Sequence, residues 1–451
     1  MLFSSFEFLF RFLPIFLLIY YLTPKKYRNV TLFGGSIVFY TIGEAGYIML
    51  LLACVLVNYT LTRLMYRKST DGRGTRQKLL LFLALGYDLG VLFFFKYSGL
   101  APELPLGISF YTFQIMAYVI DVYRGRIPVE QSLLRLGTYL TMFPQLISGP
   151  ITNYADVRVA LGRERTIRAR QLEDGMKLLI VGLAAKVVIA DRIGTLWNSI
   201  RMIGFDSIST QLAWMGAFAY SLQLYFDFAG YSMMARGIGK MLGFELPVNF
   251  RYPYISKSVT EFWRRWHITL GRWFREYVYI PLGGNRKGKA RTFFNLFVVW
   301  SLTALWHGAN YNFLIWGGIL LCCLLAEKLF LLRLLDKSRV IGHLYVLFVV
   351  PLSWVAFAVT DLSELGVYMT RLFPFAGHAA GVINHLDYLK YLNDYAPLFL
   401  LGVLFATPLP ETCYRLIERK WIGRVILLGI FGLCMYYLAV SANNPFLYFN
   451  F

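Results

Sequence analysis

Residues 6–22 read FEFLFRFLPIFLLIYYL, an almost uninterrupted apolar run in which only Glu7 and Arg11 carry charge. About 20 consecutive apolar residues are what a helix needs to cross the hydrocarbon core of a bilayer. Similar stretches recur along nearly the whole chain, in which 57% of the residues are hydrophobic and 16% are charged. Soluble domains carry about 25% charged residues, which cover their surface. The sequence therefore predicts a polytopic integral-membrane protein.

The apolar stretches vary in length, and several are short enough to be half-helices. We expect an all-α membrane protein with roughly ten to thirteen transmembrane or half-membrane helices. The opening stretch has neither a basic start nor a small-residue cleavage site, so we expect it to be retained as a first span. The other candidate spans lie at 30–43, 46–65, 79–97, 106–123, 133–151, 176–197, 208–234, 292–306, 312–332, 340–359, 395–407 and 422–440.

Positive charge is concentrated in the short loops between these stretches. The formal net charge is +20, and the basic loops lie at 24–28, 67–78, 158–177 and 251–291. An excess of Lys and Arg marks cytoplasmic loops, so we expect all four loops to face the cytoplasm. Because the basic residues flank spans, nucleic-acid binding is not expected. Simple alternation of the crossings would place the third loop outside, so we expect a broken or re-entrant segment near Met142–Gln145.

The chain shows no internal repeat, no low-complexity linker and no separate polar domain. We expect a single membrane domain over residues 1–451, with N-terminal helices at 1–175, a central core at 176–335 that contains the basic segment 251–291, and C-terminal helices at 336–451. The five cysteines mostly lie inside apolar segments. None has ligand-like spacing, which argues against a metal site or a disulfide framework.

Within the basic segment, residues 259–277 read VTEFWRRWHITLGRWFREY. At about 100° per residue, the aromatic side chains and His267 share one face of a helix and the charged side chains share the other. We expect an amphipathic helix in the membrane interface, with its arginines toward water. A purely structural anchor would show the same pattern. His267 lies on the apolar face, where an unpaired imidazole is costly, so it is either a satisfied structural histidine or a catalytic one.

A second histidine, His307, follows in the next apolar stretch, within the sequence LWHGAN at 305–310. It lies sixteen residues beyond Arg291. On a continuous helix this spacing is about 24 Å of rise, which would place His307 deep in the bilayer. Ionisable residues at such depth are rare and suggest a functional site. A neutral histidine is also well suited to accept a proton near pH 7.

Three long motifs carry a resemblance to a known family. They are FDFAGYSMMARGIGKMLGFELPVNFRYPY at 226–254, FWRRWHITLGRWFREYVYIPLGGNR at 262–286 and LWHGANYNFLIWG at 305–317. They resemble the signature of the membrane-bound O-acyltransferase family, in particular its bacterial polysaccharide O-acetyltransferase branch. The opening residues and the closing NPFLYFNF at 444–451 fit the same branch. Many relatives have a further histidine after the Trp-Gly pair, whereas Gly318 follows Trp316 and Gly317 here.

The resemblance implies roles for individual residues. It identifies His307 with the near-invariant histidine of the family, which would take a proton from the accepting hydroxyl, and His267 with a second recurrent one. Acyl transfer also needs a donor that stabilises the oxyanion, for which Trp306, Asn310 and His267 are candidates. The phosphates of a cosubstrate such as acetyl-CoA would lie near Arg264, Arg265 and Arg272. We expect no metal and no permanently bound cofactor.

The resemblance further implies acyl transfer, with acetyl as the expected group, from a cytoplasmic thioester across a bacterial inner membrane to an extracytoplasmic polysaccharide or cell-wall polymer. Membrane lipids and an extracytoplasmic, serine-hydrolase-like acyltransferase are the implied partners. Two alternatives remain open. One is D-alanyl transfer to teichoic acid from an acyl carrier protein, whose acidic surface would also suit the basic face. The other is a polysaccharide transporter, although such proteins usually show symmetry between two halves.

Overall fold

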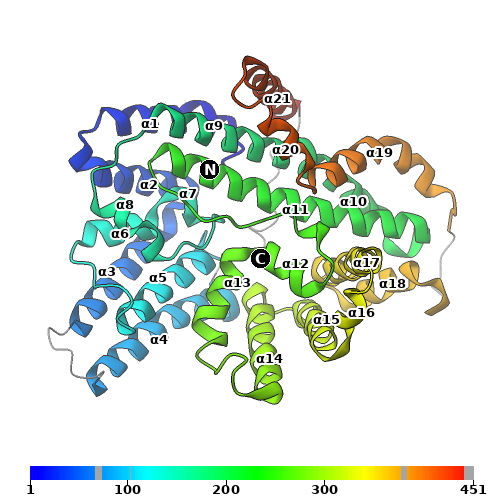
Figure 1. Ribbon diagram of the computed structural model, residues 1–451, viewed down its shortest axis with the longest axis horizontal. Helices are drawn as coiled ribbons and strands as arrows, with labels where there is room; N and C mark the ends of the chain where they lie inside the picture. Colours follow the sequence, from blue (N-terminus) through cyan, green and yellow to red (C-terminus); the bar gives the residue numbers. More distant parts are fainter. Residues whose placement is uncertain (67–73, 102, 377–382, 441–451) are drawn as a thin grey trace. The chain divides into compact units, whose positions relative to one another are not determined.

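A computed structural model describes residues 1–66, 74–101, 103–376 and 383–440 of the chain (Figure 1). Over these ranges the regular structure is helical throughout, and each apolar stretch of the sequence coincides with a helix or with a broken pair of helices. The all-α prediction is therefore confirmed. Most of the basic loop at 67–78 and the closing motif at 444–451 lie outside the described residues.

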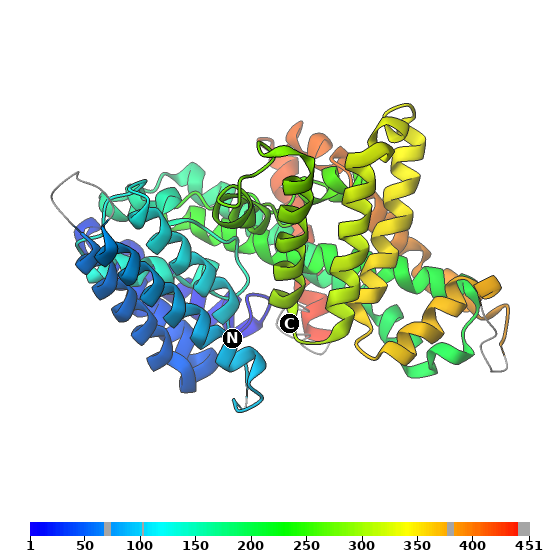
Figure 2. The same cartoon turned by 90° about the horizontal axis from the view of Figure 1, so that it is seen from below.

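The helices pack into two compact units. The first comprises Met1–Gly182, Tyr231–Val248 and Arg272–Tyr277. Its α2 packs against α6, α3 against α4 and α4 against α5, as Figures 1 and 2 show. Its helices are η1 (Glu7–Phe12), α1 (Leu13–Leu22), η2 (Lys25–Tyr27), α2 (Arg28–Glu44), η3 (Ala45–Tyr47), α3 (Ile48–Met65), α4 (Thr75–Tyr97), α5 (Ile108–Tyr123), α6 (Leu133–Thr141), α7 (Phe143–Leu146), α8 (Tyr154–Gly162) and most of α9 (Ala169–Ala184).

The second unit comprises Leu183–Gly230, Asn249–Gly271 and Val278–Phe451. Here α14 packs against α15, α15 against α17, and the short α12 against both α15 and α17. Its helices are η4 (Ala185–Ala190), α10 (Asp191–Ile203), η5 (Phe205–Ser207), α11 (Thr210–Met241, shared), η6 (Pro253–Ile255), α12 (Val259–Arg265), α13 (Ile268–Phe274, shared), η7 (Arg275–Tyr279, shared), α14 (Gly288–His307), α15 (Tyr311–Ala326), η8 (Glu327–Leu331), α16 (Leu332–Leu335), α17 (Arg339–Ala358), α18 (Leu362–Leu372), η9 (Pro374–Ala376), α19 (Asp387–Phe405), α20 (Leu409–Arg415) and α21 (Trp421–Val440). Because the helices divide into two compact units, the expectation of a single membrane domain over residues 1–451 stays a prediction.

Among the described residues, five helical stretches are long and apolar enough to cross a membrane, and a sixth is formed if α19 and α20, bent by 68° at their junction, are one broken span. The expected number of ten to thirteen is not confirmed. One reason is that several apolar stretches fold as short or broken helices. For example, the stretch at 133–151 breaks at Met142 into α6 and the four-residue α7, where a broken segment was expected.

Two glycines let α9 and α11 approach closely within the first unit. A Cβ atom added at Gly175 would lie 2.6 Å from the carbonyl oxygen of Gly237. A Cβ atom added at Gly237 would lie 2.8 Å from the backbone nitrogen of Leu179. Small residues at a helix contact allow two backbones to pack at short range, as is common in membrane proteins. Any larger side chain at either position requires the helices to separate.

The prediction of one continuous amphipathic helix at 259–277 is wrong, because the helix is interrupted at Trp266 and His267. The α12 helix ends at Arg265, and α13 begins at Ile268. His267 has a φ angle of +42°, in the left-handed region that a non-glycine residue rarely adopts. The aromatic residues of this segment are largely buried within the protein.

Candidate active site

The break at His267 is held by a segment that comes earlier in the chain. The backbone N–H of Ile268 donates a 2.9 Å hydrogen bond to the carbonyl oxygen of Asn249. The N–H of Arg251 donates a bond of the same length to the carbonyl oxygen of Arg265. The residues on either side of the break are thus paired with residues 249–251. This pairing replaces the helical hydrogen bonds that the break removes.

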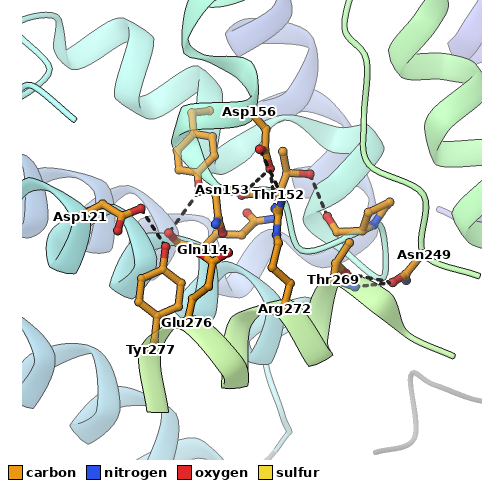
Figure 3. A network of polar contacts seen from close by, with 12 residues as sticks. Gln114, Asp121, Thr152, Asn153, Asp156, Asn249, Thr269, Arg272, Glu276 and Tyr277 are labelled. Atoms are coloured by element: carbon orange, nitrogen blue, oxygen red, sulfur yellow. Dashed lines mark hydrogen bonds and ion pairs between the residues drawn. The ribbon is translucent and has the colours of Figure 1, made fainter. Parts of the chain in front are cut away.

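The Asn249 side chain completes this arrangement. Its Oδ1 atom accepts hydrogen bonds from the Thr269 hydroxyl at 2.9 Å and from the Thr269 backbone N–H at 3.2 Å (Figure 3). The Nδ1 atom of His267 lies 3.1 Å from the same oxygen. All three side chains are buried, with 1% of Asn249 exposed. His267 is therefore a buried histidine with a partner at Nδ1, which leaves both the structural and the catalytic interpretation of this residue as predictions.

His307 is the last residue of α14 and is enclosed by aromatic rings. Its ring centroid lies 4.8 Å from that of Trp306 and 5.0 Å from those of Trp316 and Phe357. The side chain is buried, with 5% exposed. Such packing fixes the orientation of the imidazole. The depth of His307 in a bilayer stays a prediction, but its removal from solvent within the protein is observed.

Both histidines line one narrow cavity in the second unit. Its space is about that of a single water molecule. The wall is otherwise apolar and largely aromatic. The lining residues are Leu224, Trp263, Trp266, His267, Leu270, Thr303, His307, Trp316, Trp354 and Phe357. The structure thus brings together the two histidines that the sequence singled out, 40 positions apart in the chain.

Comparison with known proteins identifies the family of the chain segment that forms this cavity. The family model "MBOAT, membrane-bound O-acyltransferase family" matches residues 126–359, a range that includes every residue of the cavity. The chain belongs to the membrane-bound O-acyltransferase family. It is a multi-pass membrane enzyme, an O-acyltransferase, which decides between the enzyme and transporter interpretations.

The acyltransferase is similar over its whole length to proteins of known name. It is 35% identical to "Probable alginate O-acetylase AlgI" of Pseudomonas putida, with 100% of each chain covered. It is 29% identical to "Peptidoglycan O-acetyltransferase" of Helicobacter pylori, with 100% of this chain and 98% of the relative covered. Similarity to "Teichoic acid D-alanyltransferase" of Bacillus subtilis, 31% identical, covers 48% of this chain and 58% of the relative.

Burial controls the protonation of His267 in this acyltransferase. Removal from water lowers the pKa of His267 from its usual 6.5 to about 3, because a buried imidazolium loses its hydration. The ring is therefore neutral at physiological pH. A neutral imidazole has one nitrogen that donates and one that accepts a hydrogen bond.

Two tryptophans supply donors that the sequence analysis did not assign. The indole nitrogens of Trp263 and Trp316 are buried and have no hydrogen-bond acceptor among the described residues. Both residues line the cavity with the histidines. A buried donor without an acceptor is costly unless water or a ligand satisfies it. The only signal in the sequence was the place of Trp263 on the apolar face of the expected helix.

The other predicted residues occupy different settings. Trp306 is buried, and its ring lies 6.4 Å from that of His267, although it does not line the cavity. Asn310 precedes α15 and is exposed. It is therefore not brought to the cavity. Of these two predicted substrate contacts, Trp306 is the nearer to the histidines, and the exposed position of Asn310 outside the cavity does not favour a substrate contact.

The three arginines do not form one cluster. Arg264 is exposed and forms no ion pair within the described ranges. Arg265 pairs with Glu261 at 2.8 Å. Arg272 belongs to the first unit and pairs with Asp156 at 2.5 Å (Figure 3). Their proposed common role in phosphate binding thus rests most directly on Arg264. Over the residues that the structure describes, no group of three or more His, Cys, Asp or Glu could hold a metal ion.

Proposed function

We propose that this enzyme transfers an acetyl group from a cytoplasmic thioester donor for the O-acetylation of an extracytoplasmic polysaccharide or cell-wall polymer. The observation that carries the proposal is the end-to-end similarity to relatives named for alginate and peptidoglycan O-acetylation. These relatives are bacterial, which supports a location in a bacterial inner membrane. Similarity to a teichoic acid D-alanyltransferase extends over about half of the chain, so D-alanyl transfer is the second candidate.

In the proposed reaction, the carbon–sulfur bond of the thioester breaks and a carbon–oxygen bond to the accepting hydroxyl forms. The hydroxyl gives its proton to His307, which passes it to the departing thiolate. A general base must lie close to the proton that it takes, and the aromatic rings around His307 hold it in one orientation. The indole N–H groups of Trp263 and Trp316 stabilise the negative charge on the former carbonyl oxygen.

Acetyl-CoA is the donor that we propose, as a cosubstrate and not as a bound cofactor. Its phosphates need cationic partners, and the exposed Arg264 is the best placed of the predicted arginines. Arg265 and Arg272 already have carboxylate partners, so their contribution should be smaller. Beyond the membrane, an extracytoplasmic transferase of the serine-hydrolase type would carry the acetyl group onward to the polymer.

The test is acyl transfer from radiolabelled acetyl-CoA by the purified enzyme in nanodiscs, with wild type beside His307→Ala and Asn310→Ala. Label should move to protein or acceptor with the wild type and with Asn310→Ala, because Asn310 is exposed outside the cavity. It should not move with His307→Ala. Full transfer by His307→Ala would contradict the role of this histidine.

A D-alanyl donor is tested in the same preparation. If the wild type transfers no label from acetyl-CoA but accepts D-alanine from a charged carrier protein, the second candidate replaces the first. The carrier is acidic in this alternative, so its use should weaken as salt is added. If the enzyme uses acetyl-CoA and does not use the charged carrier protein, the proposal of acetyl transfer stands.

A further inference from the structure

The hydrogen bonds around Asn249 determine which nitrogen of His267 carries hydrogen. A backbone N–H can only donate, so the Asn249 atom that contacts the N–H of Thr269 must be an acceptor, the amide oxygen Oδ1. The Thr269 hydroxyl, 2.9 Å from the same oxygen, also donates to it. The backbone N–H of Thr269, which can only donate, thus fixes which end of the Asn249 amide is the oxygen.

The same oxygen lies 3.1 Å from Nδ1 of His267. Because an amide oxygen has no hydrogen to donate, Nδ1 must carry the hydrogen of this bond. In the neutral ring, Nε2 then has a lone pair and no hydrogen. His267 lines the cavity and its Nδ1 is directed to Asn249, so Nε2 is the ring nitrogen on the side away from Asn249.

We infer that Asn249 is a positioning residue that holds His267 in the Nδ1–H tautomer and so presents Nε2 to the cavity as a hydrogen-bond acceptor. The inference rests on the proposed function for its role in the reaction. There, Nε2 binds the accepting hydroxyl and orients its oxygen toward the thioester carbon. The sequence analysis gave His267 as a candidate donor to the oxyanion. In the Nδ1–H tautomer, Nε2 has no hydrogen and cannot fill that role.

The surroundings of His267 favour a single tautomer. Its neighbours among the described residues include the rings of Phe228, at 4.8 Å between centroids, Phe250 at 6.5 Å and Trp306 at 6.4 Å. Together with Asn249 and Thr269, these groups are uncharged, so no charged side chain among them competes for the Nδ1 hydrogen. The left-handed backbone at His267 and the bond from the Ile268 N–H to the Asn249 carbonyl keep the ring and the amide in register.

The experiment is nitrogen NMR of the full-length enzyme in nanodiscs, with only its histidines labelled with ¹⁵N. His267→Asn identifies the signals of His267. In the wild type, the shifts of His267 should be those of a neutral ring with hydrogen on Nδ1 between pH 5 and pH 8. A neutral ring with hydrogen on Nε2, or rapid exchange between the two forms, would overturn the inference.

Two variants at Asn249 test its positioning role through the tautomer of His267 and the pH profile, which a merely structural residue would not change. Asn249→Ala removes the acceptor, so a mixture of tautomers should appear and kcat should fall by about tenfold or more, with little change in the donor KM. Asn249→Asp keeps the acceptor and adds a charge that favours imidazolium. It should keep the Nδ1–H form, recover part of kcat and move the acid limb of the pH profile upward. An unchanged tautomer in Asn249→Ala contradicts the inference.

The spectra and the activity separate this inference from the proposed function. If His267 has the expected tautomer but His267→Asn transfers acetyl groups at the wild-type rate, the role in the reaction fails and the assignment of the tautomer stands. If the tautomer is the opposite one and His307→Ala is still inactive, the proposed function stands and the role of Asn249 is refuted.

Discussion

Glu327 accepts a 2.6 Å hydrogen bond from the backbone N–H of Val259, although 68 residues separate them in the chain. The second carboxylate oxygen of Glu327 accepts from the N–H of Thr260 at 2.9 Å. These N–H groups lie at the start of α12, where helical partners are missing and where negative charge is stabilised by the helix dipole. Glu327, itself buried, thereby attaches the aromatic helix of the candidate active site to the end of α15.

Glu327→Ala should lower the free energy of unfolding by about 2–3 kcal/mol, because it leaves two backbone donors at a buried helix start without an acceptor. Glu327→Gln keeps one oxygen and should lose less. Thermal melts followed by circular dichroism in detergent would measure both. The exposed Glu245 provides a control, since Glu245→Ala should change the melting temperature little. Equal melting temperatures for all three variants would show that the contact does not support α12.

Lys186 forms a buried ion pair with Asp227 at 2.6 Å and another with Asp191 at 2.7 Å. Lys186→Ala should destabilise the fold by about 3–5 kcal/mol, because it leaves a buried carboxylate without its counter-charge. The matched control is Lys177→Ala, whose partners Glu173 and Asp174 are partly exposed, and which should cost about 1 kcal/mol or less. Denaturation in detergent should therefore separate the two variants clearly.

The low pKa of His267 predicts how stability depends on pH. The folded state keeps His267 neutral down to a pKa of about 3, whereas the unfolded chain binds a proton near pH 6.5. His267 should therefore contribute no pH dependence above about pH 7. As pH falls from about 6.5 toward 3, it should lower stability by at most about 1.4 kcal/mol per pH unit.

Other groups titrate in the same window, so the informative quantity is the difference between wild type and His267→Asn. Asparagine does not titrate, and the wild type should lose its stability advantage as the pH falls. Denaturation curves from pH 7.5 down to pH 4 would measure this difference. A difference that stays constant over that range would mean that His267 is not shielded from protons in the folded state.

Trp263→Phe should lower kcat by about 100-fold while leaving the fold intact, because it removes an N–H donor and keeps an aromatic ring. The control is Trp300→Phe. Trp300 is buried, with its ring 5.0 Å from that of Trp263, but it does not line the cavity. Steady-state acetyl transfer with both variants would test the donor role. Equal losses in the two would point to ring packing as the cause.

Much of the helical fold could be predicted from the sequence, since hydropathy over some twenty residues depends only on local composition. The apolar segments coincide with helices for this reason. The number of crossings could not be obtained in the same way. Whether an apolar helix spans the bilayer or is enclosed by other helices depends on tertiary packing, as the buried α5 illustrates.

The interruption of the helix at His267 could not be predicted from the sequence for a related reason. Residues 259–277 have the periodicity of one helix, but the hydrogen bonds that interrupt it come from Asn249, eighteen residues before His267. Tertiary contacts override local periodicity here. The two histidines could be selected by residue type and family resemblance. Asn249, Trp263 and Trp316 could not, because their importance depends on which polar atoms are buried together.

The close contact of α9 and α11 has a consequence for genetics. Every amino acid that a single base change can put in place of Gly175 or Gly237 has a Cβ atom, and at both positions this atom would collide with the backbone of the facing helix. Random mutagenesis of the gene, followed by selection for a working enzyme, should therefore recover almost no substitutions at these two codons. The exposed Gly86 codon, where the added atom meets nothing within 4 Å, should vary more readily.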